Sequence, residues 1–363
     1  MTHHPKSLIG LDGVAAAETR LSAIDGERGV LMIAGERVER LAVGAGFEAV
    51  AARLWSLADG VERDPEHVRA ALAAARLVAF DMLPSLLAAT AGMPVVPAFR
   101  AAIAGLGPRG GLEPEAVIVG AMPVIAAAIV RAARGEAPVR PDPDLSHAAD
   151  TLRMLRGTLP SDAEARALDT YLVTVSDHGM NASTFASRVV ASTGADLFMA
   201  VTAGYCALTG PLHGGAPGPV LEMLDAIGGR DRIAPWIDAA LARGERLMGF
   251  GHRVYRVRDP RADVLKAAVM SLGRSEAELG LAAEVEAYAR QALARAKPDR
   301  ALDTNVEFYT AILLDALGIP RQAFTPVFAA ARAAGWTAHA MEQQRNGRLL
   351  RPAAAYVGTM PAD

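Results

Sequence analysis

The sequence has almost no cysteine, few aromatic residues and no excess of charge of either sign. Its 363 residues include one cysteine, Cys206, so no disulfide can form within the chain, which is typical of a reducing cytoplasm. We expect Cys206 to be a small apolar residue of the core. The formal net charge of −3 gives no general attraction for nucleic acid or anionic membranes. We therefore expect small-molecule or protein partners and a cytoplasmic location.

Long hydrophobic runs are also missing. The longest uncharged apolar run, 116–130, is fifteen residues long and contains Gly120 and Pro123, whereas a membrane-spanning helix needs about 18 or more. The first residues, MTHHPKSLIGLDG, contain no apolar segment of the kind found in secretory signals. These absences predict a soluble protein without a membrane span.

Several common enzyme signatures are absent as well. There is no Gly-x-Ser-x-Gly, Walker loop, His-Glu-x-x-His or Cys-x-x-Cys. The sequence therefore carries none of the signatures of serine hydrolases, P-loop nucleotide hydrolases or common zinc enzymes. A Gly-x-Gly-x-x-Gly match at Gly105, Gly107 and Gly110 follows an alanine-rich helical stretch and contains Pro108. This context does not fit a dinucleotide-binding turn, which follows a strand.

What the sequence does contain is long stretches of helix-forming residues. Alanine, leucine, arginine and glutamate dominate, whereas runs of β-branched residues are brief, and this pattern predicts a mainly helical protein. The chain is longer than the roughly 250–300 residues at which single cores usually divide. We therefore expect two domains, or one large domain with an inserted lobe.

The clearest predicted helices lie in the C-terminal half. One begins at Ser275, which forms a capping box with Glu278, and ends before Pro298. Another runs from Val306 to Leu317, with Gly318 placed for a C-cap.

Further elements are predicted in the N-terminal half. Amphipathic helices are expected at 48–58 and 65–83. A small hairpin is expected at 18–33, turning at Asp25-Gly26, and the proline-rich stretch 134–146 is expected to be a connector.

Three histidines lie where regular structure is interrupted. His213 lies in the glycine- and proline-rich segment TGPLHGGAPGP, His252 lies in GFGHRVYRVRDPRA, and His178 lies in VSDHGMNAST. Loops that combine glycine, proline and a titratable group are a common setting for catalytic residues on a rigid scaffold. We interpret the three histidines as candidate functional residues.

The surroundings of His213 and Glu307 suggest acid–base chemistry. His213 precedes Pro219, which we predict as the first residue of a helix, and a helix N-terminus disfavours a charged imidazolium. A neutral imidazole can donate a hydrogen bond to a developing enolate oxygen. Glu307 lies in the first turn of its predicted helix, where a carboxylate either complements the helix dipole or serves as a general base. The sequence leaves both roles of Glu307 open.

At these residues the sequence resembles the citrate synthase family. The motifs DHGMNASTFASRVVAST, GPLHGG, GFGHRVYRVRDPRA, NVEFYTAILLDALGIP and RAAGWTAHAMEQQRNGRLLRP follow in the family's order, and GLDGVAAAETRLSAIDGERGVL resembles its N-terminal segment. The resemblance implies an all-α fold with a small N-terminal β-hairpin. It also implies a large helical domain, 1–218 and 327–363, with a smaller helical domain, 219–326, that closes over substrate.

The resemblance further implies an activity and its partners. The family condenses acetyl-CoA with oxaloacetate to give citrate and CoA, an acyltransferase reaction of the tricarboxylic acid cycle. Acetyl-CoA is then a co-substrate, no cofactor is permanently bound, and no metal, nucleic acid or membrane is expected. A homodimer is expected.

Eight residues take roles by their positions in the family motifs. His213 would donate to the thioester oxygen, His252 would polarise the oxaloacetate carbonyl, and Glu307 would remove the methyl proton. Arg256 would lie near CoA. The residues implied to bind oxaloacetate are His178, Arg261, Arg332 and, contributed across the dimer interface, Arg351. This inventory suits the chemistry, since enolisation needs a base and an opposing donor, and arginine forks hold carboxylates.

The sequence departs from the family pattern at three places. Glu307 replaces the usual aspartate, Ala216-Pro217-Gly218 replaces Ala-Asn-Glu, and Val175 replaces a histidine found in some relatives. Because a misplacement of about 1 Å can cost about 100-fold in rate, Glu307 requires either a compensating backbone shift or a slow enzyme. Two alternatives stay open: a 2-methylcitrate synthase that uses propionyl-CoA, and a weakly active paralogue with a ligand-sensing or partner-binding role.

Overall fold

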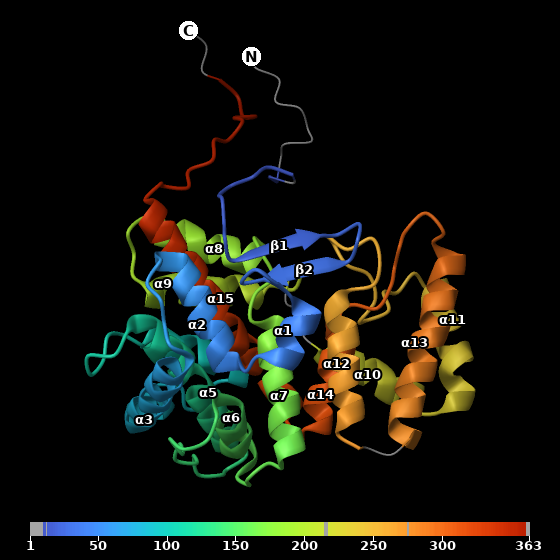
Figure 1. Cartoon of the computed structure of the whole chain (residues 1–363). Helices are drawn as coiled ribbons and strands as arrows, with labels where there is room; N and C mark the ends of the chain where they lie inside the picture. Colours follow the sequence, from blue (N-terminus) through green and yellow to red (C-terminus); the bar gives the residue numbers. More distant parts are fainter. Residues whose placement is uncertain (1–9, 12, 214–216, 274–275, 361–363) are drawn as a thin grey trace.

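Alanine- and leucine-rich segments form helices along most of the chain, as the composition predicts (Figure 1). The computed structural model describes residues 10–11, 13–213, 217–273 and 276–360. Within them lie fifteen α-helices and one small antiparallel sheet. The predicted all-α fold with a small N-terminal hairpin is therefore confirmed.

The helices follow one another with mostly short connections. They are α1 (Val38–Gly44), α2 (Phe47–Asp59), α3 (Pro65–Ala89), α4 (Val95–Ala104), α5 (Pro114–Ala133), α6 (His147–Arg156), α7 (Asp162–Val175), α8 (Ala182–Ala191), α9 (Leu197–Leu208), α10 (Gly218–Ile227), α11 (Ile233–Ala242), α12 (Pro260–Ser271), α13 (Glu276–Ala296), α14 (Val306–Ala316) and α15 (Phe324–Asn346).

The N-terminal sheet has three strands in the order β1-β2-β3. Strands β1 (Ser22–Asp25) and β2 (Val30–Ile33) form the predicted hairpin, with Asp25 opposite Val30 and the turn at residues 26–29. The third strand, β3 (Glu36–Arg37), was not predicted, because two residues are too few to show an alternating pattern.

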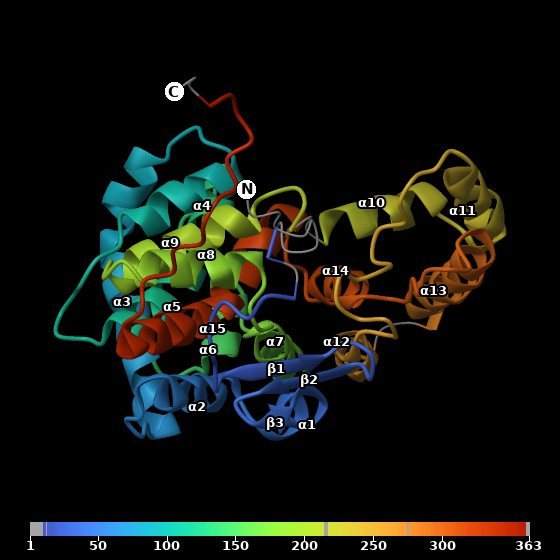
Figure 2. The same cartoon turned by 90° about the horizontal axis from the view of Figure 1, so that it is seen from above.

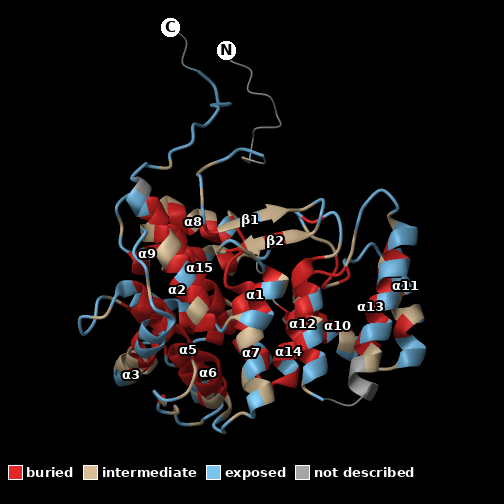
Figure 3. Cartoon of the chain, viewed as in Figure 1, coloured by how far each residue is buried: buried red, intermediate tan, exposed pale blue. Residues whose placement is uncertain are grey.

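Helix α5 lies at the centre of the core. It packs against α3, α4, α6 and α15, and Figure 3 shows that the elements around α5 and α15 are largely buried. Both α3 and α5 are long and apolar enough to cross a membrane by length and composition alone. In α5 the most apolar window is 83% buried inside the protein, which is the environment of a core helix.

Helices α10, α11 and α13 are arranged away from this core. Figure 2 shows α10, α11 and α13 at one end of the molecule and α2 to α9 at the other. Helix α12 packs on both α7 and α14, and α14 packs on α10, so α12 and α14 together connect the two groups. The domain boundaries near residues 218 and 326 stay a prediction.

Several sequence-based expectations need correction or limits. Cys206 is exposed and is not a core residue, because it lies on the outward face of α9 while its neighbour Tyr205 points inward. Helix α10 begins at Gly218, one residue before the predicted start. The predicted capping box of Ser275 with Glu278 lies outside the described residues.

Replacing Gly120 by alanine should destabilise the protein, although alanine is the better helix former by about 1 kcal/mol. A Cβ at this position of α5 would lie 2.6 Å from the Cβ of Ala75 and 2.9 Å from the carbonyl oxygen of Leu72. Both atoms belong to α3, which must move away, and overpacking of this kind costs about 1–3 kcal/mol. We expect urea denaturation to show a lower free energy of unfolding.

The matched control for this substitution is Gly44→Ala at the exposed end of α1, where a Cβ meets nothing within 4 Å. This control should be at least as stable as the wild type. Equal stability of the two variants would contradict close helix packing at Gly120.

Candidate active site

The loop that carries His252 is paired with the segment that leads into α14. The backbone N–H of Gly251 donates to the carbonyl of Asp303 over 2.7 Å, and that of Asn305 donates to the carbonyl of Gly249 over 2.9 Å. The side-chain amide of Asn305 adds a bond of 2.8 Å to the carbonyl of Gly251. These bonds place the histidine loop against the start of α14 although the two segments are about fifty residues apart in the chain.

Glycine is required at both ends of this short pairing. Gly249 and Gly251 have φ angles of +84° and +83°, a region that other residues rarely adopt. A Cβ at Gly249 would also lie 2.9 Å from the side chain of Phe308 on α14. Because Phe308 follows Glu307 directly, the loop with His252 and the helix with Glu307 are packed together.

The ring of His252 is oriented by its own loop. Its Nδ1 accepts hydrogen bonds from the backbone N–H groups of Val254 (3.0 Å) and Tyr255 (3.1 Å). An acceptor nitrogen carries no proton, so the proton of the neutral ring is on Nε2, where it is available to a ligand. Burial, helped by the charge of Arg261, lowers the pKa of His252 to about 4.

His178 lies beside His252 and is buried. The ring centroids of the two histidines are 5.4 Å apart, and the His178 Nε2 lies 3.1 Å from the hydroxyl of Tyr255. Burial, with the charge of Arg261 as the next cause, lowers the pKa of His178 well below its ordinary value. Tyr255 thus contacts both histidines, and no signal in the sequence marked it out.

The first turn of α8 orients the ring of His213. Its Nε2 accepts from the backbone N–H of Ser183 over 3.3 Å and lies 3.0 Å from the Ser183 hydroxyl. The proton of the neutral ring is therefore on Nδ1. Burial lowers the pKa of His213 to about 4, so the imidazole is neutral, as expected. The helix N-terminus that contacts His213 belongs to α8, whereas the sequence suggested the helix at Pro219.

Arg261 is buried at the start of α12 and is paired with Asp259. Its Nε and Nη2 donate to the two carboxylate oxygens of Asp259 over 3.0 and 2.8 Å. Asp259 also caps α12 and accepts the backbone N–H of Val306 at the start of α14. One carboxylate therefore connects both helix N-termini to the guanidinium. The dipeptide Asp259-Pro260 is an N-cap signal that identifies this role in the sequence.

Arg332 is another buried arginine, and it projects from α15. Its Nε donates to the carbonyl of Val175 over 2.7 Å, and its guanidinium lies 4.9 Å from the centre of the Phe328 ring. Burial lowers the pKa of Arg332 to about 10, so it stays charged at neutral pH. The backbone of Val175 thus supports Arg332.

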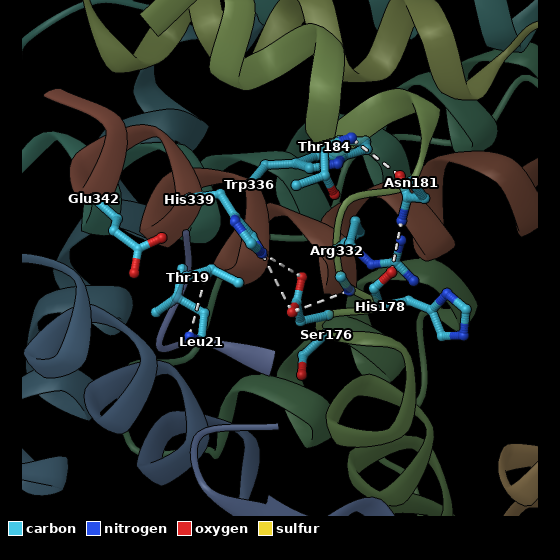
Figure 4. A network of polar contacts seen from close by, with 12 residues as sticks. Thr19, Leu21, Ser176, His178, Asn181, Thr184, Arg332, Trp336, His339 and Glu342 are labelled. Atoms are coloured by element: carbon cyan, nitrogen blue, oxygen red, sulfur yellow. Dashed lines mark hydrogen bonds and ion pairs between the residues drawn. The ribbon is translucent and has the colours of Figure 1, made fainter. Parts of the chain in front are cut away.

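A network of buried polar groups lies behind His178 and Arg332 (Figure 4). The Nε2 of His339 lies 3.2 Å from Asp177, the residue before His178, and its Nδ1 accepts from Arg188 over 2.9 Å. Although burial alone would raise the pKa of Asp177, His339 and Arg332 hold it at about 2. Asp177 is thus a fixed negative charge near Arg332, and sequence reasoning did not identify it.

Glu307 stands in the first turn of α14, whose N-cap is Asn305. Burial raises the pKa of Glu307 above its ordinary value, and the charges of Arg246 and Arg261 counteract only part of this effect. Within the described parts of the chain, no side chain donates a hydrogen bond to its carboxylate. Such a carboxylate is a stronger base than an exposed one and is free to accept a proton.

Each of the two buried arginines shifts the pKa values of several of these groups, which shows that the groups lie near one another. Arg261 shifts the pKa values of His178, His252 and Glu307. Arg332 shifts those of His178 and His213. The structure therefore brings three histidines, one glutamate and two buried arginines into one region.

Two predicted residues lie outside this cluster. Arg256 is exposed on the loop after His252, where its backbone N–H donates to the carbonyl of Gly26 in the N-terminal hairpin. Arg351 is exposed in the C-terminal segment, which follows α15 and leaves the body of the molecule (Figure 1). This chain alone does not bring Arg351 to the cluster.

A separate surface hollow of about 440 Å³ lies elsewhere, between α2 and the starts of α3 and α5. It is lined by Trp55, Arg63, His67 and Glu115 among others, and contains none of the candidate residues. Within the ranges that the structure describes, no group of three or more histidine, cysteine, aspartate or glutamate side chains is placed to hold a metal ion.

Known proteins resemble the chain over nearly its whole length. The citrate synthase of Haloferax volcanii is 38% identical over 98% of this chain and 96% of its own, and that of Acidithiobacillus ferridurans is 36% identical with the same coverage. The citrate synthase of Thermoplasma acidophilum, solved in a ternary complex with carboxymethyl coenzyme A and oxaloacetate, superposes with a TM-score of 0.85. It is 28% identical and covers 98% of this chain and 97% of its own.

The citrate synthase structure from Thermotoga maritima superposes with a TM-score of 0.84 at 31% identity, covering 98% of this chain and 96% of its own. The family model described as "Citrate synthase, C-terminal domain" matches residues 10–353. With this match and these full-length relatives, the chain belongs to the citrate synthase family.

Proposed function

We propose that the protein condenses acetyl-CoA with oxaloacetate to give citrate and CoA. The observation that carries this proposal is a set of groups in one region: two neutral imidazoles, the partly buried carboxylate of Glu307, to which no described side chain donates, and two buried guanidinium groups. The relatives named citrate synthase, and the ternary complex of the Thermoplasma acidophilum protein with oxaloacetate and a coenzyme A derivative, support it.

The cationic residues of the cluster bind oxaloacetate. Its two carboxylates suit Arg261 and Arg332, because a guanidinium fork binds a carboxylate through two parallel hydrogen bonds. His178 lies beside His252 and supplies a further polar contact. The Nε2–H of His252 then points its hydrogen bond at the ketone oxygen and polarises the carbonyl for attack.

Glu307 and His213 carry out the enolisation of acetyl-CoA. The Glu307 carboxylate removes a methyl proton from acetyl-CoA, while the Nδ1–H of His213 donates a hydrogen bond to the thioester oxygen, where negative charge develops. A neutral imidazole suits this task because the backbone N–H of Ser183 occupies its other nitrogen.

Carbon–carbon bond formation and hydrolysis complete the reaction. The enol carbon attacks the ketone carbon of oxaloacetate, and the proton of His252 passes to the new alkoxide oxygen. Water then cleaves the thioester of citryl-CoA, which releases citrate and CoA. The reaction needs a closed site during the first step, since water would protonate the enol prematurely.

We place the acyl-CoA near the exposed Arg256 and favour acetyl-CoA over propionyl-CoA. Glu307 is one methylene longer than the usual aspartate, so it occupies room beside the acyl methyl that a propionyl group needs. One methylene in a pocket changes selectivity by about 10- to 200-fold. The direct test is CoA release from the two substrates side by side with oxaloacetate. A preference for propionyl-CoA would indicate 2-methylcitrate synthesis, and turnover at background with oxaloacetate still bound would indicate a non-catalytic paralogue.

We also propose a cytoplasmic homodimer in which Arg351 reaches the partner's site. The chain leaves apolar side chains exposed, among them Leu212 at 86% after α9 and Val357 in the C-terminal segment. Exposed apolar surface of this kind gains burial against a second molecule. Sedimentation should give the mass of two chains, and the mass of one chain would contradict the dimer.

Replacing Glu307 by glutamine should abolish turnover and spare oxaloacetate binding. Glutamine keeps the size of the side chain but cannot accept the methyl proton, and general-base catalysis contributes about 10²- to 10⁴-fold. Steady-state CoA release and calorimetric titration with oxaloacetate measure the two properties separately. Turnover like that of the wild type would assign the base to another residue.

Activity should fall as the pH is lowered, because Glu307 must be ionised to act as a base. Since burial raises the pKa of Glu307, this decline begins at higher pH than for an exposed carboxyl group. The histidines do not cause it, because the pKa values of His213 and His252 are about 4. Arg246→Gln removes a charge that lowers the pKa of Glu307, so the acid limb of kcat/KM should move to higher pH.

A control for this shift is Arg243→Gln. Arg243 is a nearby exposed arginine that pairs with Glu245, and it does not act on Glu307. Its pH profile should match the wild type. An acid limb that stays in place in Arg246→Gln would show that another group controls it.

A further inference from the structure

One buried carboxylate accepts hydrogen bonds from four side chains that take no part in the proposed mechanism. Glu286, on α13, is 4% exposed. One of its oxygens accepts from Arg258 (2.6 Å) and Thr304 (2.8 Å), and the other accepts from Lys266 (3.1 Å) and Tyr309 (2.5 Å). An ionised carboxylate offers about four acceptor positions, so these four donors occupy all of them.

Each donor belongs to a segment that carries a group of the candidate active site. Arg258 directly precedes Asp259, the partner of Arg261. Tyr309 lies on α14 two residues after Glu307. The other two donors lie on α12 and in the loop that leads into α14. A single side chain from α13 therefore contacts the arginine-bearing segment and the base-bearing helix together.

The network is ionic and stays so throughout the working pH range. Although burial alone would raise the pKa of Glu286, the hydrogen bonds from Tyr309, Arg258 and Thr304 hold it at about 2. Hydrogen bonds to a charged acceptor are stronger than neutral ones, and a buried charge that loses its partners is strongly destabilised. The four donors consequently have a strong preference for one arrangement around the carboxylate.

The start of α14 is then fixed from two sides. Asp259 binds the backbone N–H of Val306 on the side of Arg261, and Glu286 binds Tyr309 one turn further along. This matters for Glu307 because its extra methylene adds a rotatable bond between the backbone and the carboxylate. The alignment of a longer side chain depends more strongly on a fixed backbone, and about 1 Å of misplacement can cost about 100-fold in rate.

We propose that Glu286 is a positioning residue for proton abstraction, which holds α14 and thereby Glu307 in register with the segment that binds oxaloacetate. This inference rests on the proposed condensation of acetyl-CoA with oxaloacetate. Glu286 touches neither substrate. Its effect is transmitted through Tyr309 and Arg258.

The test is Glu286→Gln in the full-length protein. The amide NH₂ of glutamine is a donor and cannot accept from two of the four partners, so their arrangement must change. We expect kcat with acetyl-CoA to fall by about 10- to 100-fold, within the range that misplacement of about 1 Å produces. Oxaloacetate binding by calorimetry should keep its wild-type stoichiometry. The deuterium isotope effect on kcat with methyl-deuterated acetyl-CoA should be at least as large as in the wild type.

Other outcomes would overturn the inference. One is a wild-type kcat in Glu286→Gln. Another is a loss of activity that only parallels a loss of oxaloacetate-binding sites, with no increase in the isotope effect, since that result indicates a role in folding alone. A wild type that does not turn over acetyl-CoA would instead overturn the proposed function, so the two failures are distinguishable.

Two more variants complete the experiment. Tyr309→Phe removes only the hydroxyl that links Glu286 to α14, and it gives the same test if Glu286→Gln does not fold. Glu284→Gln is the matched control on the same helix, because Glu284 is exposed and pairs only with Arg230 among the described residues. Tyr309→Phe should lower kcat and retain the isotope effect, whereas Glu284→Gln should behave as the wild type. Equal kinetics of Tyr309→Phe and Glu284→Gln would contradict the inference.

Discussion

The candidate active site depends on the pairing of the histidine loop with the segment before α14. Three hydrogen bonds between residues 249–251 and 303–305 join parts of the chain that are distant in sequence. They have this geometry because Gly249 and Gly251 adopt positive φ angles and let Phe308 approach closely. Without this pairing, the hydrogen-bond donor His252 and the carboxylate of Glu307 would belong to separate surfaces. Asp259 reinforces it by binding Arg261 and the first N–H of α14 with one carboxylate.

The backbone also fixes the tautomers of the two imidazoles to which we assign catalytic roles. In both His213 and His252, backbone N–H groups bond to one ring nitrogen, so the other must carry the proton. Burial lowers the pKa values of both rings to about 4, which keeps them neutral. The same low-dielectric surroundings raise the pKa of Glu307, so burial makes the two imidazoles weaker bases and the carboxylate a stronger base. Donors and acceptor are thereby matched to enolisation at neutral pH.

The elements that the sequence predicted best are those with local signals. The helix predicted from Val306, with Gly318 placed for its C-cap, corresponds to α14, and the Asp25-Gly26 turn marks the hairpin, because each signal depends on a few neighbouring residues. The network groups could not be found in this way. Tyr255, Asp177 and Glu286 are ordinary residues in the sequence, and their roles arise only from side chains that meet through tertiary packing. The outward position of Cys206 was missed for a related reason, since an apolar helix does not reveal which face is covered.

The glutamate at position 307 shows how a change in one side chain shifts demands onto the rest of the structure. A base with one more methylene has more conformations available, and each conformation other than the productive one lowers the rate. Rigid support of α14 compensates for this, because it reduces the uncertainty in the carboxylate position to the rotamers of one side chain. The structure provides that support through Asp259 at the first N–H of the helix and through Glu286 at Tyr309. The longer side chain of Glu307 and the Glu286 carboxylate, which accepts four hydrogen bonds, are thus two parts of one arrangement.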